Sequence, residues 1–149
     1  MQILLLTNSN SVENNSKYFS NDSGILSLMY HRFNENKYPS TNIRMGVFKE
    51  QIQIINDLNY TFYDPKNFVS QFDVPKNKKK ILITIDDGFK SFYKEAWPYL
   101  KENKIPFILF VSTEPVGRNG YMDWNEIKEI EKFDFAFIGH HSHTHEYLI

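Results

Sequence analysis

Short apolar runs recur along this chain and are separated by segments with the periodicity of helices. Four runs are rich in Ile, Leu, Val and Phe, and they predict β-strands over residues 25–30, 80–85, 107–111 and 133–138. We expect residues 25–30 to form a buried strand. We expect residues 107–111, which are all apolar, to be covered on both faces of a parallel sheet.

Four helices are predicted between these strands. They cover residues 47–58, 65–72, 89–103 and 124–132. Apolar residues recur at helical spacing in the first of them. Asp64 and Pro65 supply an N-cap and a favourable first residue for the second. Pro98 is expected to kink the third, and Asp123 with Glu126 has the spacing of a capping box that begins the fourth.

The predicted elements alternate between strand and helix from residue 25 to residue 138. Such alternation is typical of α/β proteins whose strands are mostly parallel. The 149 residues contain no internal repeat and no linker that would divide them, which favours a single domain. In folds of this class the functional groups collect on the loops that follow the C-terminal ends of the strands.

The composition excludes several classes of function. Lys and Arg number 17 and Asp and Glu number 18, so the net charge of −1 leaves no basic excess for a nucleic-acid surface. The sequence has no Cys, which excludes disulfides, iron–sulfur clusters, thiol nucleophiles and thiolate zinc sites. Any metal must therefore be held by His and carboxylate side chains.

Residues 1–23 predict a flexible lead-in. The apolar run within residues 1–7 is shorter than a signal-peptide core of roughly 7–15 residues, and no basic residue precedes it. It fits either the remnant of a clipped signal peptide or a short strand. Residues 8–23 are rich in Asn and Ser, as in flexible segments. No apolar run approaches the roughly 20 residues that a transmembrane helix needs.

Two adjacent carboxylates, Asp86 and Asp87, follow the predicted strand at residues 80–85. Neighbouring side chains at a strand end point in different directions, so one carboxylate can bind a metal while the other stays free as a base. The alternative is an Asp-Gly turn with Gly88 that merely ends the strand.

A histidine cluster follows the predicted strand at residues 133–138. Its members are His140, His141, His143 and His145. His141 and His145 can meet one cation if the loop turns helically, whereas His141 and His143 can do so only from an extended strand. One carboxylate with two imidazoles makes a three-ligand site with an open position, which is typical of catalytic metal centres. A metal-free α/β binding domain is the simplest alternative.

Both clusters resemble the motifs of a known family. Residues 84–88 (Thr-Ile-Asp-Asp-Gly) are similar to the T-F-D-D-G motif, and residues 141–145 (His-Ser-His-Thr-His) to the H-[S/T]-x-x-H motif, of the polysaccharide deacetylases, also called carbohydrate esterase family 4 or NodB-homology domains. The resemblance extends from about residue 25 to the end of the chain. Residues 28–32 (Leu-Met-Tyr-His-Arg) and 122–124 (Met-Asp-Trp) resemble the branch that de-N-acetylates poly-β-1,6-N-acetylglucosamine of biofilms.

The resemblance implies a role for each matching residue. Asp87, His141 and His145 would hold a divalent metal, with zinc the first expectation and cobalt, nickel or iron also suitable. Asp86 would be the general base and His31 the general acid. His140 and His143 match variable motif positions and are left as neighbours of the site.

The implied fold is an α/β, incomplete and distorted (β/α) barrel of the deacetylase type. A complete barrel needs roughly 200 residues or more, so residues 24–149 would be the N-terminal portion of the domain. We therefore expect the isolated chain to be marginally stable or prone to aggregate. Its oligomeric state cannot be predicted from the sequence.

The implied activity is the removal of N-acetyl groups from an N-acetylglucosamine-containing polysaccharide, with release of acetate, outside the cytoplasm. The polysaccharide is the only partner that the resemblance implies. Two rival interpretations stay open. One is a truncated or non-catalytic carbohydrate-binding relative. The other is a different metallohydrolase that binds its metal through His141, His143 and His145 from one face of a strand.

Overall fold

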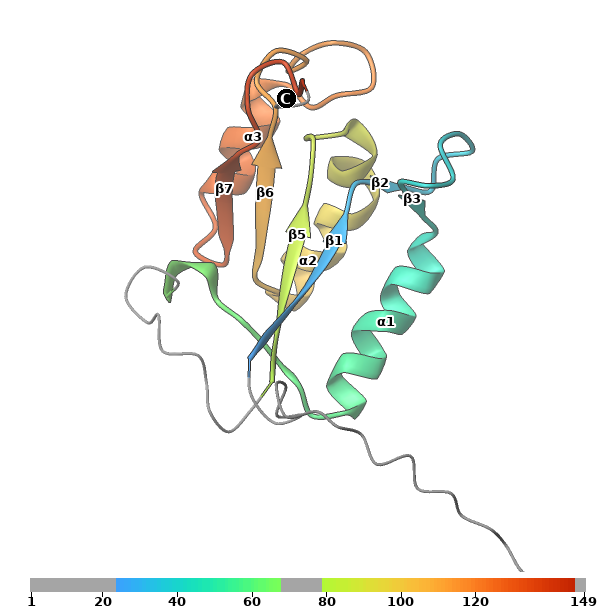
Figure 1. Ribbon diagram of the computed structural model, residues 1–149, viewed down its shortest axis with the longest axis vertical. Coiled ribbons are helices and arrows are strands. Elements are labelled where there is room, and N and C mark those ends of the chain that lie inside the picture. The colour runs from blue at the N-terminus through green and yellow to red at the C-terminus, as the bar shows by residue number, and fades with distance from the viewer. Residues whose placement is uncertain (1–23, 68–78, 147–149) are drawn as a thin grey trace, which may run out of the picture.

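A parallel sheet forms the centre of the computed structural model, which describes residues 24–67 and 79–146 (Figure 1). Its main strands are, in spatial order, β1 (Ile25–Tyr30), β5 (Lys80–Ile85), β6 (Phe107–Val111) and β7 (Ala136–His140). Every neighbouring pair is parallel. A short strand, β4 (Thr61–Phe62), pairs with the first two residues of β5. The predicted α/β class with a parallel sheet is confirmed.

Three α-helices connect the strands. They are α1 (Met45–Asp57), α2 (Trp97–Asn103) and α3 (Trp124–Glu131), and a π-helix, η2 (Phe92–Ala96), leads directly into α2. Helices α2 and α3 lie behind the sheet in Figure 1, and α1 runs beside β1. The apolar face predicted for the first helix packs inward through Phe48, Ile52 and Ile55, whereas Leu58, just after its end, is exposed.

Pro98 was predicted to kink its helix, and the structure shows an irregular π-helical turn just before this proline. Pro98 occupies the first turn of α2, and the amide of Trp97 donates to the carbonyl of Phe92, which is the wider spacing of a π-helix. A proline ring clashes with the carbonyl four residues before it in a regular α-helix. The π-helix widens the backbone at the position where that clash would occur.

Two strand predictions need correction. The strand expected at residues 133–138 begins only at Ala136, because residues 133–136 form a turn in which the Ala136 amide donates to the Phe133 carbonyl. The strand at residues 25–30 has the predicted bounds but is not buried. Within the described ranges β1 pairs on one side with β5, and Leu26 and Met29 are 54% and 61% exposed.

Shorter elements also differ from the prediction. Instead of a helix at 65–72, the structure has a 3₁₀ turn at Pro65–Asn67, and the remainder of that prediction lies outside the described residues, as does the lead-in at residues 1–23. Two strands of two residues each, β2 (Arg32–Phe33) and β3 (Asn42–Ile43), pair in parallel beyond the end of β1 and were not predicted. Among the described helices none has the length and apolar character needed to cross a membrane.

The two faces of the sheet differ in how they are covered. On β6, Phe107, Leu109 and Val111 are buried, whereas the alternating Ile108 and Phe110 are partly exposed. Phe137 of β7, which pairs with Ile108, is 42% exposed on that second face. The main core therefore lies between the sheet and its helices.

The strand register brings the C-terminal ends of the strands to one edge of the sheet. Tyr30, the last residue of β1, pairs with Ile85, the last residue of β5. Val111 at the end of β6 pairs with His140 at the end of β7. The loops that follow these four strands thus meet at the upper edge of the sheet in Figure 1.

Candidate metal centre and active site

The turn after β5 carries Asp86 and Asp87. The Asp86 amide donates to the carbonyl of Tyr30 at 2.8 Å, which fixes the turn against the end of β1. Asp87 and Gly88 both adopt left-handed backbone conformations, with φ of +72° and +74°. Such a conformation is uncommon for a residue other than glycine, and it concentrates at functional sites. It turns the Asp87 side chain toward the loop that follows β7.

The loop after β7 is held against the end of β6. The amide of His141 donates to the Val111 carbonyl at 3.0 Å, and the Ser112 hydroxyl donates to the His141 carbonyl at 2.9 Å. Ser142 and His145 have positive φ angles of +62° and +59°, and the His145 amide donates to the Ser142 hydroxyl at 3.0 Å. The loop thus makes a tight turn that brings His145 back beside His141.

Three ligand atoms meet where these loops touch. Asp87 Oδ1 lies 3.3 Å from His141 Nε2 and 3.2 Å from His145 Nε2, and the two Nε2 atoms are 3.0 Å apart. A tetrahedral zinc with bonds of about 2.0–2.1 Å places its ligand atoms roughly 3.3–3.4 Å from one another. The triangle therefore has nearly the size that one small divalent cation requires.

The donor set also fits a cation. Among the described residues, Asp86 Oδ1 and Asp87 Oδ1 are the buried side-chain oxygens with no hydrogen-bond partner. A buried carboxylate oxygen without a partner is costly, and coordination to a metal is one way to satisfy it. Two imidazoles and a carboxylate suit zinc, cobalt, nickel and iron alike.

Asp86 lies beside the triangle and is 7% exposed. Its Oδ2 atom is 4.0 Å from His141 Nε2, so its carboxyl remains apart from the three ligand atoms. Burial raises the pKa of the Asp86 carboxyl, and Asp87 raises it further, while His141, His31 and His145 lower it by their charge.

The other histidines are placed differently. His31 follows β1, is half-buried, and lowers the pKa of Asp86 by its charge. It also lines a second cavity of about 300 Å³ with residues 40–43. His143 turns away from the triangle, with Nδ1 2.8 Å from the Thr113 hydroxyl. His140 is exposed at the end of β7.

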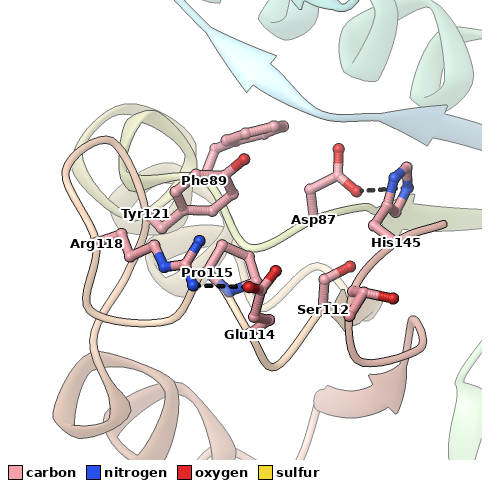
Figure 2. Close-up of a pocket in the computed structure, with 9 residues that line it drawn as sticks. Asp87, Phe89, Ser112, Glu114, Pro115, Arg118, Tyr121 and His145 are labelled. Atoms are coloured by element: carbon pink, nitrogen blue, oxygen red, sulfur yellow. Dashed lines mark hydrogen bonds and ion pairs between the residues drawn. The ribbon is translucent and has the colours of Figure 1, made fainter.

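A cavity of about 390 Å³ opens beside Asp87 and His145 (Figure 2). The loop after β6 forms its far wall with Ser112, Glu114, Pro115, Arg118 and Tyr121. The Arg118 guanidinium donates to Glu114 at 2.7 Å, and the ring of Tyr121 packs beside Phe89 with 4.9 Å between centroids. The sequence did not single out Ser112, Glu114 and Arg118, although their position just after a strand was an available signal.

Comparisons with known proteins point to one family. A family model described as polysaccharide deacetylase matches residues 73–149. A putative polysaccharide deacetylase of Bacillus subtilis, YxkH, is 25% identical over 123 residues, covering 81% of this chain and 42% of that protein. A poly-beta-1,6-N-acetyl-D-glucosamine N-deacetylase of Staphylococcus epidermidis is 24% identical, covering 98% of this chain and 60% of that protein.

Solved structures agree with this assignment. IcaB from Ammonifex degensii superposes with a TM-score of 0.68 at 29% identity, over 78% of this chain and 52% of that one. The deacetylase PplD of Streptococcus pyogenes shares the fold, with a TM-score of 0.68 at 24% identity over 84% of this chain and 59% of that one. The chain spans about half the length of the relatives that it matches. Since the family model covers more than half of the chain, the protein belongs to the polysaccharide deacetylase family.

Proposed function

We propose that this protein is a metal-dependent deacetylase that hydrolyses N-acetyl groups of an N-acetylglucosamine-containing polysaccharide and releases acetate. The observation that carries the proposal is the triangle of Asp87, His141 and His145 ligand atoms, 3.0–3.3 Å apart, beside the buried carboxyl of Asp86. The similarity to a putative polysaccharide deacetylase and to a poly-beta-1,6-N-acetyl-D-glucosamine N-deacetylase supports the substrate class. Such polymers are found outside the cytoplasm, where we propose the protein acts.

We assign the metal to Asp87, His141 and His145, with zinc as the preferred ion. When bound, a divalent cation supplies a Lewis acid that polarises the acetamide carbonyl and makes a water molecule more acidic. The protein's part is to hold three ligands on the loops that follow β5 and β7 and to leave the cavity side of the triangle open. His143 does not belong to this set, because its ring contacts Thr113.

Asp86 is the proposed general base. It accepts a proton from the water that attacks the acetamide carbon. Its carboxyl has a buried Oδ1 without a hydrogen-bond partner, so a lone pair is available. Burial raises its pKa and so makes it a stronger base than an exposed aspartate.

His31 is the proposed general acid. As the tetrahedral carbon collapses, its C–N bond breaks and the sugar nitrogen needs a proton to leave as an amine. His31 directly follows β1 and its charge lowers the pKa of Asp86, whereas the two ligand histidines lie on the loop after β7. Two groups on different strand ends can thus deliver and remove protons on different sides of the acetamide.

Acetate release tests this function directly. The full chain is loaded with zinc or cobalt and incubated with β-1,6-linked N-acetylglucosamine oligomers, and wild type is compared with Asp86→Asn. We expect Asp86→Asn to lower kcat by about 10²- to 10⁴-fold, the usual contribution of a general base. Asp134→Asn, at an exposed aspartate before β7, is the matched control and should leave kcat unchanged.

Two results would contradict the proposal. Equal rates for wild type and Asp86→Asn would remove the catalytic role of the site. Oligomer binding without any release of acetate would favour the rival interpretation, a non-catalytic carbohydrate-binding relative.

A further inference from the structure

The guanidinium of Arg32 is held between two aromatic rings. Its Cζ atom lies 3.4 Å from the centroid of the Phe89 ring and 4.4 Å from that of Tyr38. Glu35 pairs with the same guanidinium at 3.0 Å, and the Arg32 side chain is 16% exposed. A planar guanidinium can stack on a ring and bind a carboxylate at once, which a lysine ammonium cannot do in the same geometry.

The groups around Arg32 are themselves fixed. The Glu35 backbone exchanges two hydrogen bonds with the Asn42 side chain, both at 2.9 Å. Tyr38 has a φ of +60°, an unusual value for a bulky residue, and its carbonyl accepts from the Thr41 amide at 3.1 Å. The Arg32 amide donates to the Thr41 carbonyl at 3.0 Å. The stack is therefore preorganised from several directions.

The stack joins two loops that carry different chemical groups. Arg32 directly follows His31 and begins β2 in the segment after β1, and Phe89 follows Asp86 and Asp87 on the loop after β5. A second link runs parallel to it, because the Phe33 amide donates to the hydroxyl of Ser91 at 3.2 Å. Among the described residues none forms a hydrogen bond with the His31 ring, so the position of this ring depends on the segment that carries it.

We propose that Arg32 is a positioning residue that fixes the His31 imidazole relative to Asp86 by clamping the loop after β1 onto Phe89. The inference deepens the proposed function and rests on it. Arg32 reaches neither the ligand triangle nor the reacting atoms; it acts through His31. A misplacement of about 1 Å in a catalytic group can cost about 10²-fold in rate.

Kinetics with two substrates isolates this role. Arg32→Lys keeps the charge and loses the stack, and Arg44→Lys, at an exposed arginine before α1, is the control. On acetamide oligomers we expect kcat of Arg32→Lys to fall about 10- to 100-fold with KM and bound metal unchanged. On an aryl acetate ester, whose phenolate leaves without a proton, we expect both variants to match wild type. In a His31→Ala background Arg32→Lys should cost nothing further on the oligomer.

The positioning role would be overturned if Arg32→Lys lowered kcat equally on the ester and on the acetamide. It would also be overturned if Arg32→Lys lowered kcat in the His31→Ala background by the same factor as in wild type. A second measurement needs no activity: urea unfolding of Arg32→Lys, Phe89→Leu and the double variant. If the clamp exists, the double variant loses less stability than the sum of the two single variants, and strict additivity would refute it. A wild type that releases no acetate would contradict the proposed function, while the unfolding cycle would still decide whether the clamp exists.

Discussion

His141 and His145 present their Nε2 atoms to each other at 3.0 Å, although the two residues are four apart on an irregular loop. Without a cation, one of these nitrogens must carry a hydrogen for the contact to be attractive. Asp87 Oδ1 lies within 3.3 Å of both rings. The positive φ angles of Asp87, Ser142 and His145 are the backbone cost of this arrangement, and a bound cation would offset it.

This geometry predicts which histidines hold the metal. His141→Ala and His145→Ala should each weaken zinc binding by more than about 100-fold. Even the loss of a residue that only hydrogen-bonds to a metal ligand typically lowers metal affinity by about 10- to 100-fold. His143→Ala, the matched control on the same loop, should retain affinity because its ring contacts Thr113. Isothermal titration of chelator-treated protein provides the measurement. Loss of metal in His143→Ala as well as in His141→Ala and His145→Ala would instead support the rival set of three alternating histidines, and retention of metal in His141→Ala would contradict our assignment.

A second prediction concerns stability without metal. Because burial raises the folded-state pKa of Asp86 above its unfolded value, the stability associated with its protonated form is fully present below the unfolded pKa. That stability is lost as the pH rises through the folded pKa. Asp86→Asn should therefore be more stable than wild type at pH 7 in chelator. This advantage should shrink, by about 1.4 kcal/mol for each unit of pKa shift, as the pH falls through the folded pKa to the unfolded pKa near 3.8.

Urea unfolding of both proteins at pH 7 and at pH 3.5 checks this sign. Asp134→Asn, at an exposed aspartate, serves again as the control for the loss of a surface carboxylate. The prediction would be contradicted if Asp86→Asn were less stable than wild type at pH 7. It would also be contradicted if the difference in unfolding free energy between the two proteins were the same at both pH values.

The strands and helices that were predicted accurately are those whose signals are local. The bounds of β5 and β6 follow from continuous apolar runs, and α3 begins at its capping box, in which Asp123 accepts from the Glu126 amide and Glu126 from the Asp123 amide. The start of β7 was placed too early because Phe133 and Phe135 pack on Trp97 instead of joining the sheet. An apolar run in the sequence does not show whether its residues pair in the sheet or pack against a helix.

Part of the site was predictable because its signals are also local in the sequence. Aspartates and histidines that directly follow strands can be located from the sequence alone, because parallel strands end at one edge of a sheet. The pairing of Arg32 with Asn42 in β2 and β3, and the contact of Arg32 with Phe89, join distant segments. The course of the loop after β6, which places Arg118 in the cavity wall, likewise depends on tertiary packing.

The cavity wall leads to a prediction about substrate binding. Tyr121 lines the cavity and packs beside Phe89, so one face of its ring can stack on a pyranose. Tyr121→Leu should raise KM for acetylated oligomers by about 10-fold, which corresponds to about 1.4 kcal/mol of binding, with a smaller change in kcat. Trp124→Leu, at a 50% exposed aromatic that does not line the cavity, is the control and should change neither constant. A larger KM effect for Trp124→Leu would show that the sugar binds elsewhere.

The close approach of Gly139 to Phe110 gives the last prediction. A Cβ at residue 139 would lie 2.5 Å and 2.6 Å from two ring carbons of Phe110, whose ring centroid is 6.3 Å from that of His141. Gly139→Ala must therefore displace the phenylalanine ring, which lies beside His141, one of the proposed metal ligands. We expect a loss of about 1–3 kcal/mol in unfolding free energy, the usual cost of overpacking, and weaker zinc binding.

Gly46→Ala provides the opposite case, because no atom lies within 4 Å of the added methyl group and its φ is not positive. There the substitution should be neutral or stabilising, by up to about 1 kcal/mol, since alanine favours a helix over glycine. Urea unfolding and zinc titration of both variants provide the comparison. In a Phe110→Leu background, where the smaller side chain leaves room, Gly139→Ala should cost less than in wild type. Equal stability of Gly139→Ala and Gly46→Ala, or an undiminished cost in the Phe110→Leu background, would show that the contact between residues 110 and 139 does not constrain the site.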